Sequence, residues 1–70
     1  MAGQPHIVEL EREADGRWLA EVIDLAGVLA YGATRDEALA MAEALALRVI
    51  AVRLEHGERA PELDNLFTAA

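Results

Sequence analysis

The stretch Gly32-Ala-Thr-Arg-Asp-Glu-Ala-Leu-Ala-Met-Ala-Glu-Ala-Leu-Ala-Leu-Arg-Val-Ile-Ala-Val-Arg-Leu-Glu-His-Gly57 decides the fold, because it predicts one long helix with a defined start and end. Thr34 followed by Glu37 forms a capping box, in which the Thr34 hydroxyl accepts from the Glu37 amide and the Glu37 carboxylate accepts from the Thr34 amide. Gly57 can adopt the left-handed conformation that ends a helix, and Pro61 prevents an early restart. A helix of about 22 residues is a rod of roughly 33 Å.

This helix is apolar on more than one side. Between residues 38 and 54 only Glu43, Arg48 and Arg53 are charged. A helix that is apolar all round is normally buried all round, and one small sheet can cover only one side. We therefore expect a second covering surface, most simply another copy of the chain. The alternative is that alanine, a weak hydrophobe with a high helix propensity, accounts for much of the pattern.

The residues before the helix predict three strands. Alternation of apolar and polar residues and the intervening turn residues place strands at residues 6–13, 17–23 and 28–31, and turns at residues 14–16 and 24–27. A two-residue Asp-Gly turn would set Leu10 opposite Glu21, on one face. A three-residue loop with Gly16 in the left-handed position instead sets Leu10 opposite Ala20. In that register the face under the helix holds Val8, Leu10, Trp18, Ala20, Val22, Val28 and Ala30.

The opposite face of the predicted sheet is too apolar for a surface that meets only water, and such a patch usually marks an interface. Glu9 and Glu21 also oppose each other on it, and a like-charge pair across two strands is unfavourable. A cation from a partner would relieve this repulsion, whereas solvent could merely screen it. With two residues of the helix added, the candidate interface comprises Ile7, Glu9, Leu19, Glu21, Ile23, Leu29, Tyr31, Leu39 and Ile50.

The 70 residues are expected to form a single α+β domain, a three-stranded antiparallel sheet with one long helix. Residues 1–5 are a loose start, residues 6–57 the core, and residues 58–70 a C-terminal segment. That segment either docks as a short fourth edge strand, completing a β-β-β-α-β order, or covers a neighbouring subunit. Chains of this size bury only about 60% of their unfolded surface. Since there is no cysteine to cross-link the chain, association into a dimer or tetramer is the expected route to more burial.

Charge and composition narrow the classes of function. The net charge of −7 argues against direct nucleic-acid binding and favours a basic partner, or simply solubility. No apolar run is long enough to cross a membrane without charge, and residues 1–5 do not resemble a signal peptide. The lack of cysteine fits a reducing cytosol, so we expect a cytoplasmic protein.

No set of residues predicts catalysis. His6 starts a strand and His56 ends the helix, and no known nucleotide-binding, nucleophile or metal motif is present. Glu9 with Glu21 could contribute two carboxylates to a metal, but two carboxylates without a third ligand make a weak signal. We therefore expect no enzyme activity, no metal and no cofactor.

Three segments resemble the HicB-type antitoxin family: Asp15-Gly16-Arg17-Trp18, then Asp24-Leu25-Ala26-Gly27, then Gly32-x-Thr34-x-x-Glu37-Ala38 with the long helix after it. The resemblance covers roughly residues 6–62, although Ile23 and Ala26 replace both prolines of the family's loop. It implies a partial ribonuclease-H-like fold without nuclease activity. It also implies a role in masking a small basic RNA-cleaving toxin of the HicA type.

Many members of that family bind DNA through a C-terminal helix-turn-helix or ribbon-helix-helix segment. The residues after the helix are too few to form one, so operator binding is not expected here. The resemblance thus leads to a stand-alone, homo-oligomeric antitoxin-like domain from a bacterial toxin-antitoxin system. The alternative is a homo-oligomeric structural or small-ligand-binding protein that has no toxin partner.

Overall fold

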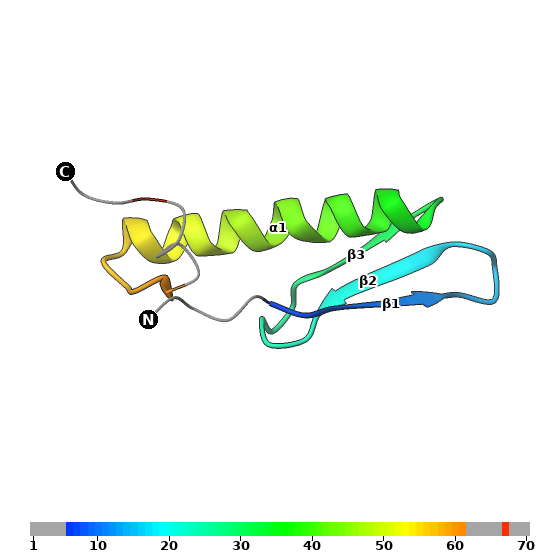
Figure 1. Cartoon of the computed structure of the whole chain (residues 1–70), viewed down its shortest axis with the longest axis horizontal. Helices are drawn as coiled ribbons and strands as arrows, with labels where there is room; N and C mark the ends of the chain where they lie inside the picture. Colours follow the sequence, from blue (N-terminus) through cyan, green and yellow to red (C-terminus); the bar gives the residue numbers. More distant parts are fainter. Residues whose placement is uncertain (1–5, 62–66, 68–70) are drawn as a thin grey trace.

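The computed structural model describes residues 6–61 and Phe67, and it has two layers (Figure 1). The elements are β1 (Val8–Arg12), β2 (Trp18–Val22), β3 (Leu29–Gly32) and α1 (Arg35–Glu55). The sheet is antiparallel with the strand order β1-β2-β3, and α1 lies across one of its faces. The predicted α+β fold, with three antiparallel strands and one long helix, is confirmed.

The structure describes only part of the predicted C-terminal segment and none of the predicted loose start. The loose start at residues 1–5 lies outside the described residues, as do residues 62–66 and 68–70 of the C-terminal segment. Residues 58–61 contain no strand. The fourth edge strand therefore stays a prediction for the part of the chain beyond them.

The register of the first hairpin is the predicted one. Val8 pairs with Val22, Leu10 with Ala20, and Arg12 with Trp18. The loop is closed by an N–H of Glu13 that donates to the Arg17 carbonyl at 2.7 Å, and Gly16 has a φ of +91°. The three-residue loop with a left-handed glycine thus decides which side chains of both strands face the helix.

The cap at the start of α1 differs from the prediction in one bond. The Glu37 amide donates to the Thr34 hydroxyl at 3.1 Å, as expected. The Glu37 carboxylate, however, accepts from the Ala33 amide at 3.1 Å and not from the Thr34 amide. Thr34 itself is extended, with φ −123° and ψ 163°, as an N-cap residue usually is.

The end of α1 is a Schellman motif, as Gly57 predicts. Gly57 has a φ of +79°. Its N–H donates to the Leu54 carbonyl at 3.0 Å, and the Glu58 N–H donates to the Arg53 carbonyl at 2.8 Å. These two bonds satisfy carbonyls that the helix itself leaves open, so the helix ends at a defined residue.

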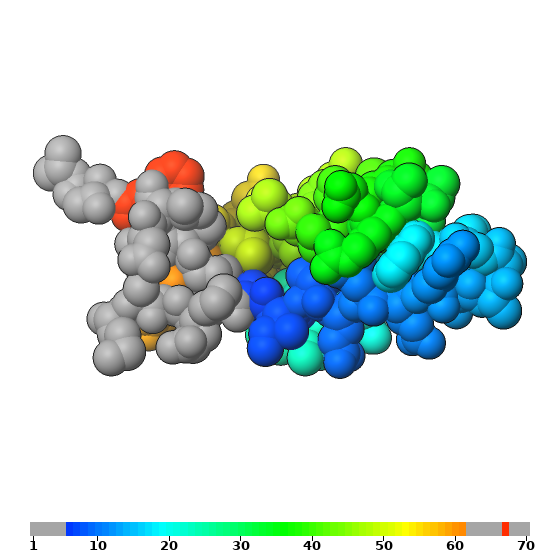
Figure 2. All heavy atoms as spheres, turned by 45° about the vertical axis from the view of Figure 1, so that its right-hand side comes forward, coloured from blue at the N-terminus to red at the C-terminus, as the bar shows by residue number. Residues whose placement is uncertain are grey.

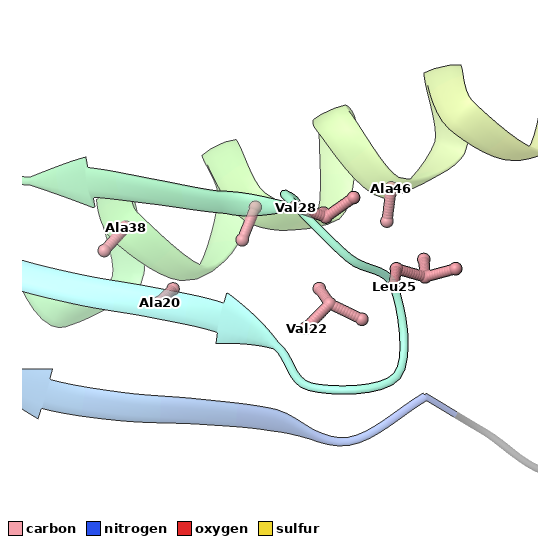
Figure 3. Close-up of a cluster of buried hydrophobic side chains, with 7 residues drawn as sticks. Ala20, Val22, Leu25, Val28, Ala38 and Ala46 are labelled. Carbon is pink, nitrogen blue, oxygen red and sulfur yellow. The ribbon is translucent and has the colours of Figure 1, made fainter.

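The core lies between α1 and the sheet and is made of small side chains (Figure 3). Helix alanines face a sheet face that matches the prediction in all seven residues. The buried members of the cluster are Ala20, Val22, Leu25, Val28, Ala38, Ala42 and Ala46. Small side chains let the helix backbone come close to the sheet, and at the buried Gly32 there is no room even for a Cβ atom beside the backbone of Ala38.

One member of the core was expected to lie only in a turn. Leu25 is 3% exposed, and it belongs to two successive turns between β2 and β3. Its N–H donates to the Val22 carbonyl, and its carbonyl accepts from the Val28 N–H, both at 3.1 Å. The side chain at this shared corner packs in the core cluster, so the turn at residues 24–27 closes the end of the core.

The helix is longer than the sheet. Its 21 residues span about 31 Å at 1.5 Å each, whereas a strand of 5 residues spans about 17 Å. The C-terminal part of α1 therefore extends past the strands (Figure 1). In this single chain the helix is not buried all round. Its exposed large apolar side chains are Met41, Leu47, Val52 and Leu54.

Candidate functional site

The face of the sheet that points away from α1 is a mixed surface of carboxylates and apolar side chains. Pairing between strands arranges these side chains in rows across the sheet. The first row is Ile7 and Ile23, the second is Glu9, Glu21 and Leu29, and the third is Glu11, Leu19 and Tyr31. We call these eight residues the outer sheet face. Its edge strand β1 lies at the surface of the molecule (Figure 2, blue).

The structure brings together seven of the nine residues predicted for the interface. Ile7 is the most exposed of them, at 63%, and Ile23, Leu29 and Tyr31 are also exposed, whereas Leu19 is half-buried. The two helix residues do not join this face. Ile50 is 5% exposed and so is buried in the chain itself, and Leu39 is half-buried on α1.

That difference has a geometric reason. The outer sheet face and α1 lie on opposite sides of the sheet, so a helix residue cannot extend this face. Ile50 follows Ala38, Ala42 and Ala46 at four-residue spacing, which keeps it on the buried side of the helix. The candidate surface on the sheet is therefore the outer sheet face alone.

The carboxylates of the outer sheet face form no ion pair with any cation among residues 6–61. Glu9 pairs directly with Glu21, as the register predicts, and Glu11 is the next outward-facing residue on β1. The ion pairs of the described residues do not include Glu9, Glu11 or Glu21. Three exposed negative charges thus lie beside exposed apolar side chains, an arrangement that suits a partner carrying cations.

The hairpin end of this face is occupied by a cation of the chain itself. The Arg17 guanidinium lies 4.5 Å from the centre of the Tyr31 ring. Its Nε also donates to the Asp15 carboxylate at 2.8 Å, and the backbone amide of Arg17 donates to the same carboxylate at 3.1 Å. The backbone hydrogen bond from Arg17, followed by that of its side chain, lowers the pKa of Asp15. Arg17 therefore covers one side of the Tyr31 ring at the end of the outer sheet face, a contact of about 0.5–1 kcal/mol at exposed sites.

His6 and Asp24 form a second polar pair, beyond the opposite end of the hairpin. The His6 Nδ1 lies 2.7 and 2.8 Å from the two carboxylate oxygens of Asp24. The predicted register already contained this pair, because pairing Val8 with Val22 also sets residue 6 opposite residue 24. The composition of residues 24–27 indicates only a turn, so the pair follows from the register and not from the residue types.

Acid should weaken the fold through Asp24. The hydrogen bond from His6, with smaller contributions from the charges of His6 and Arg53, holds the pKa of Asp24 below its ordinary value of 3.8. A lowered pKa stabilises the fold above the ordinary value, and this contribution is lost as the pH falls through the folded-state pKa. The Asp24→Asn variant should therefore lose less of its thermal stability than the wild type below pH 3.8.

The measurement is the midpoint of thermal unfolding over an acid pH series. Glu58→Gln serves as the control, because Glu58 is an exposed carboxylate after the helix. A wild type whose midpoint falls no more steeply with acid than that of Asp24→Asn would show that the pair contributes nothing.

Comparison with known proteins adds no relative. No family model, no curated protein and no solved structure matches the chain. The resemblance to the HicB-type family therefore rests on the sequence pattern alone.

Three further observations concern the surface of the molecule. Within the described residues, no three side chains of histidine, cysteine, aspartate or glutamate gather where they could hold a metal ion. No helix in the same part of the chain is both long and apolar enough to cross a bilayer. A shallow hollow of about 280 Å³ on α1 is lined by Arg48, Val49, Val52 and Arg53.

Proposed function

We propose that the chain is a HicB-like protein-interaction domain that binds a small basic protein through its outer sheet face. The partner that fits the sequence resemblance is an RNA-cleaving toxin of the HicA type, which the domain would mask as a cytoplasmic antitoxin. In this role the chain acts by binding, as a homo-oligomer, and is not itself an enzyme. The observation that carries the proposal is the exposed set of unpaired carboxylates among apolar side chains on one face of the sheet.

Charge supports a partner of this kind. A protein that cleaves RNA has to present cations to the phosphates of its substrate. The acidic outer sheet face, on a chain with a net charge of −7, would attract the cationic surface of the toxin. It would then cover that surface in place of RNA. Apolar side chains at the same place, such as Ile23 and Leu29, would supply the area that a stable complex buries.

Reversing one charge at the centre of the face should separate binding from folding. In Glu21→Lys the new ammonium lies opposite Glu9, so the repulsion between two carboxylates becomes an attraction and the free chain should be no less stable. The same change places a cation against a basic partner, and the dissociation constant should rise at least about tenfold. Titration calorimetry with any small basic protein that is encoded next to this chain and co-purifies with it measures the dissociation constant, and unfolding of the free chain measures its stability.

Glu58→Lys is the matched control, because it makes the same change of charge at an exposed position away from the sheet. Steering by net charge alone would weaken binding equally in both variants, and that result would argue against the outer sheet face as the binding site. The absence of any small basic neighbour that co-purifies with the chain would remove the antitoxin role itself.

The exposed apolar residues of α1 favour a second candidate function. In this reading the chain is a homo-oligomeric structural or small-ligand-binding protein without a toxin partner, and its apolar surfaces serve self-association. The hollow at Val49 and Val52 would be the place for a small ligand. Light scattering and hydrogen exchange together discriminate between the two functions. Light scattering gives the mass of the assembly, and hydrogen exchange shows whether the outer sheet face is covered in it. A stable tetramer with this face protected would leave no surface for a toxin.

A further inference from the structure

The side of α1 that faces away from the sheet carries a continuous apolar seam. Its residues follow one another at intervals of four, three, four and three, the spacing that two helices need in order to pack along their length. We call this set the helix seam: Ala40, Ala44, Leu47, Ala51 and Leu54. Leu47 is 58% exposed and Leu54 is 47% exposed, so the two largest side chains of the seam lie open to solvent.

The helix seam is separate from the buried side of the helix. Buried residues of α1 are Ala38, Ala42, Ala46 and Ile50. At about 100° per residue, the middle of that set and the middle of the seam lie roughly 150° apart around the helix axis. A second helix can therefore lie along the seam without displacing the sheet.

Two charges beside the seam specify which partner fits it. Glu43 and Arg48 flank it on opposite sides and are both exposed. They are five residues apart, a spacing that does not bring side chains of one helix together. In two parallel helices packed along such a seam, residues at this spacing face each other across the pair. Glu43 of each copy then meets Arg48 of the other.

Antiparallel packing lacks this complementarity. In two antiparallel helices, the Arg48 side of one seam faces the Arg48 side of the other. When the two seams overlap fully, Arg48 of one copy lies beside Arg48 of the other. Two arginines at close range repel each other, whereas the parallel arrangement forms two Glu43–Arg48 pairs by symmetry. The charges therefore favour a second copy of this chain in parallel orientation.

We propose that two copies of the chain associate through the helix seam, with their helices parallel and their outer sheet faces pointing outward. This specifies the self-association that is part of the proposed function. It leaves the outer sheet face of each copy available, so the dimer presents two binding surfaces.

The first test is Leu47→Glu, measured by sedimentation equilibrium over a concentration series. Because Leu47 is exposed in the single chain, a glutamate there should leave the fold intact, which circular dichroism checks. The wild type should have the mass of two chains, and the variant should dissociate at least about tenfold more readily, since it places a charge in the seam. Leu29→Glu is the matched control on the outer sheet face, and it should keep the mass of two chains.

The second test fixes the orientation. Glu43→Arg and Arg48→Glu should each weaken the dimer, since each leaves like charges facing, and the double variant should regain the wild-type dissociation constant. A double variant that is as weak as the single variants would exclude the parallel pair. A wild type that is a monomer, or a Leu47→Glu variant that stays a dimer, would overturn the helix seam as an interface.

Binding of the basic partner is measured on the same variants. Monomeric Leu47→Glu should still bind it, because the outer sheet face is unchanged. A Leu47→Glu variant that no longer self-associates but still binds the partner would support the helix seam as the dimer interface. A wild type that binds no basic partner would count against the proposed function alone.

Discussion

Replacing Gly32 with alanine is expected to destabilise the fold by about 3 kcal/mol, the upper part of the range for overpacking in a core. A Cβ at this position would overlap the backbone nitrogen of Ala38 and lie 2.9 Å from its Cα. Those atoms belong to the first turn of α1 and cannot rotate away as a side chain could. Alanine restricts the unfolded chain more than glycine does, but that gain is only about 0.4–1 kcal/mol. The clash should therefore prevail.

Chemical denaturation at a fixed protein concentration measures this effect, and Gly16→Ala is its control. At Gly16 a Cβ would meet nothing within 4 Å, but its φ of +91° makes the backbone unfavourable for alanine. That cost is about 1–2 kcal/mol. A Gly32→Ala variant as stable as the wild type would mean that the first turn of α1 leaves room for a Cβ at β3.

Leu25→Ala is expected to destabilise the fold by about 2–3 kcal/mol, although the residue lies in a connecting turn. The side chain is almost completely buried and packs in the core cluster. Its removal leaves a cavity at the end of the core where β2 and β3 are joined. The loss should be visible as a lower denaturant midpoint with an unchanged slope.

Ile23→Ala is the matched control for Leu25→Ala, because Ile23 is an aliphatic residue two positions earlier and half exposed. Its truncation removes about half as much buried apolar area, so it should cost under about 1 kcal/mol. Equal losses in the two variants would mean that Leu25 packs no better than a surface residue.

The sheet and the helix could be predicted from local signals in the sequence. A left-handed glycine at the hairpin loop and the alternation of side chains specify the register together, since a shift by one residue would place Glu21 on the core side. Thr34 and Gly57 specify the ends of α1 by hydrogen bonds within a few residues of themselves. Such features depend on neighbours in the sequence, which is why they can be read from it.

The missed features depend on contacts between distant residues. Asp24, Leu25, Ala26 and Gly27 form a typical turn, and nothing in their composition shows that one side chain is directed into the core. The conformation of the two turns decides that, with Gly27 at a φ of +79°. Likewise, Ile50 has the same hydrophobicity whether it faces the chain's own interior or a partner.

The sequence predicts which residues form the outer sheet face, but it does not identify the molecule that binds there. Alternation along the strands placed Glu9, Leu19 and Tyr31 on one face, and the structure has them there. Arg17 and Tyr31 are diagonal neighbours on this face, because Leu19 pairs with Tyr31. Their contact therefore also follows from the register. Which molecule covers this face depends on the surface of that molecule, so it has to be tested by binding.

The order of the strands has a kinetic consequence. Because β1, β2 and β3 are neighbours in space in the same order as along the chain, each pairing closes only a short loop. Short loops cost little entropy, and a topology rich in local contacts folds quickly. We expect the isolated chain to refold within milliseconds in a single phase, before two copies have time to meet in dilute solution.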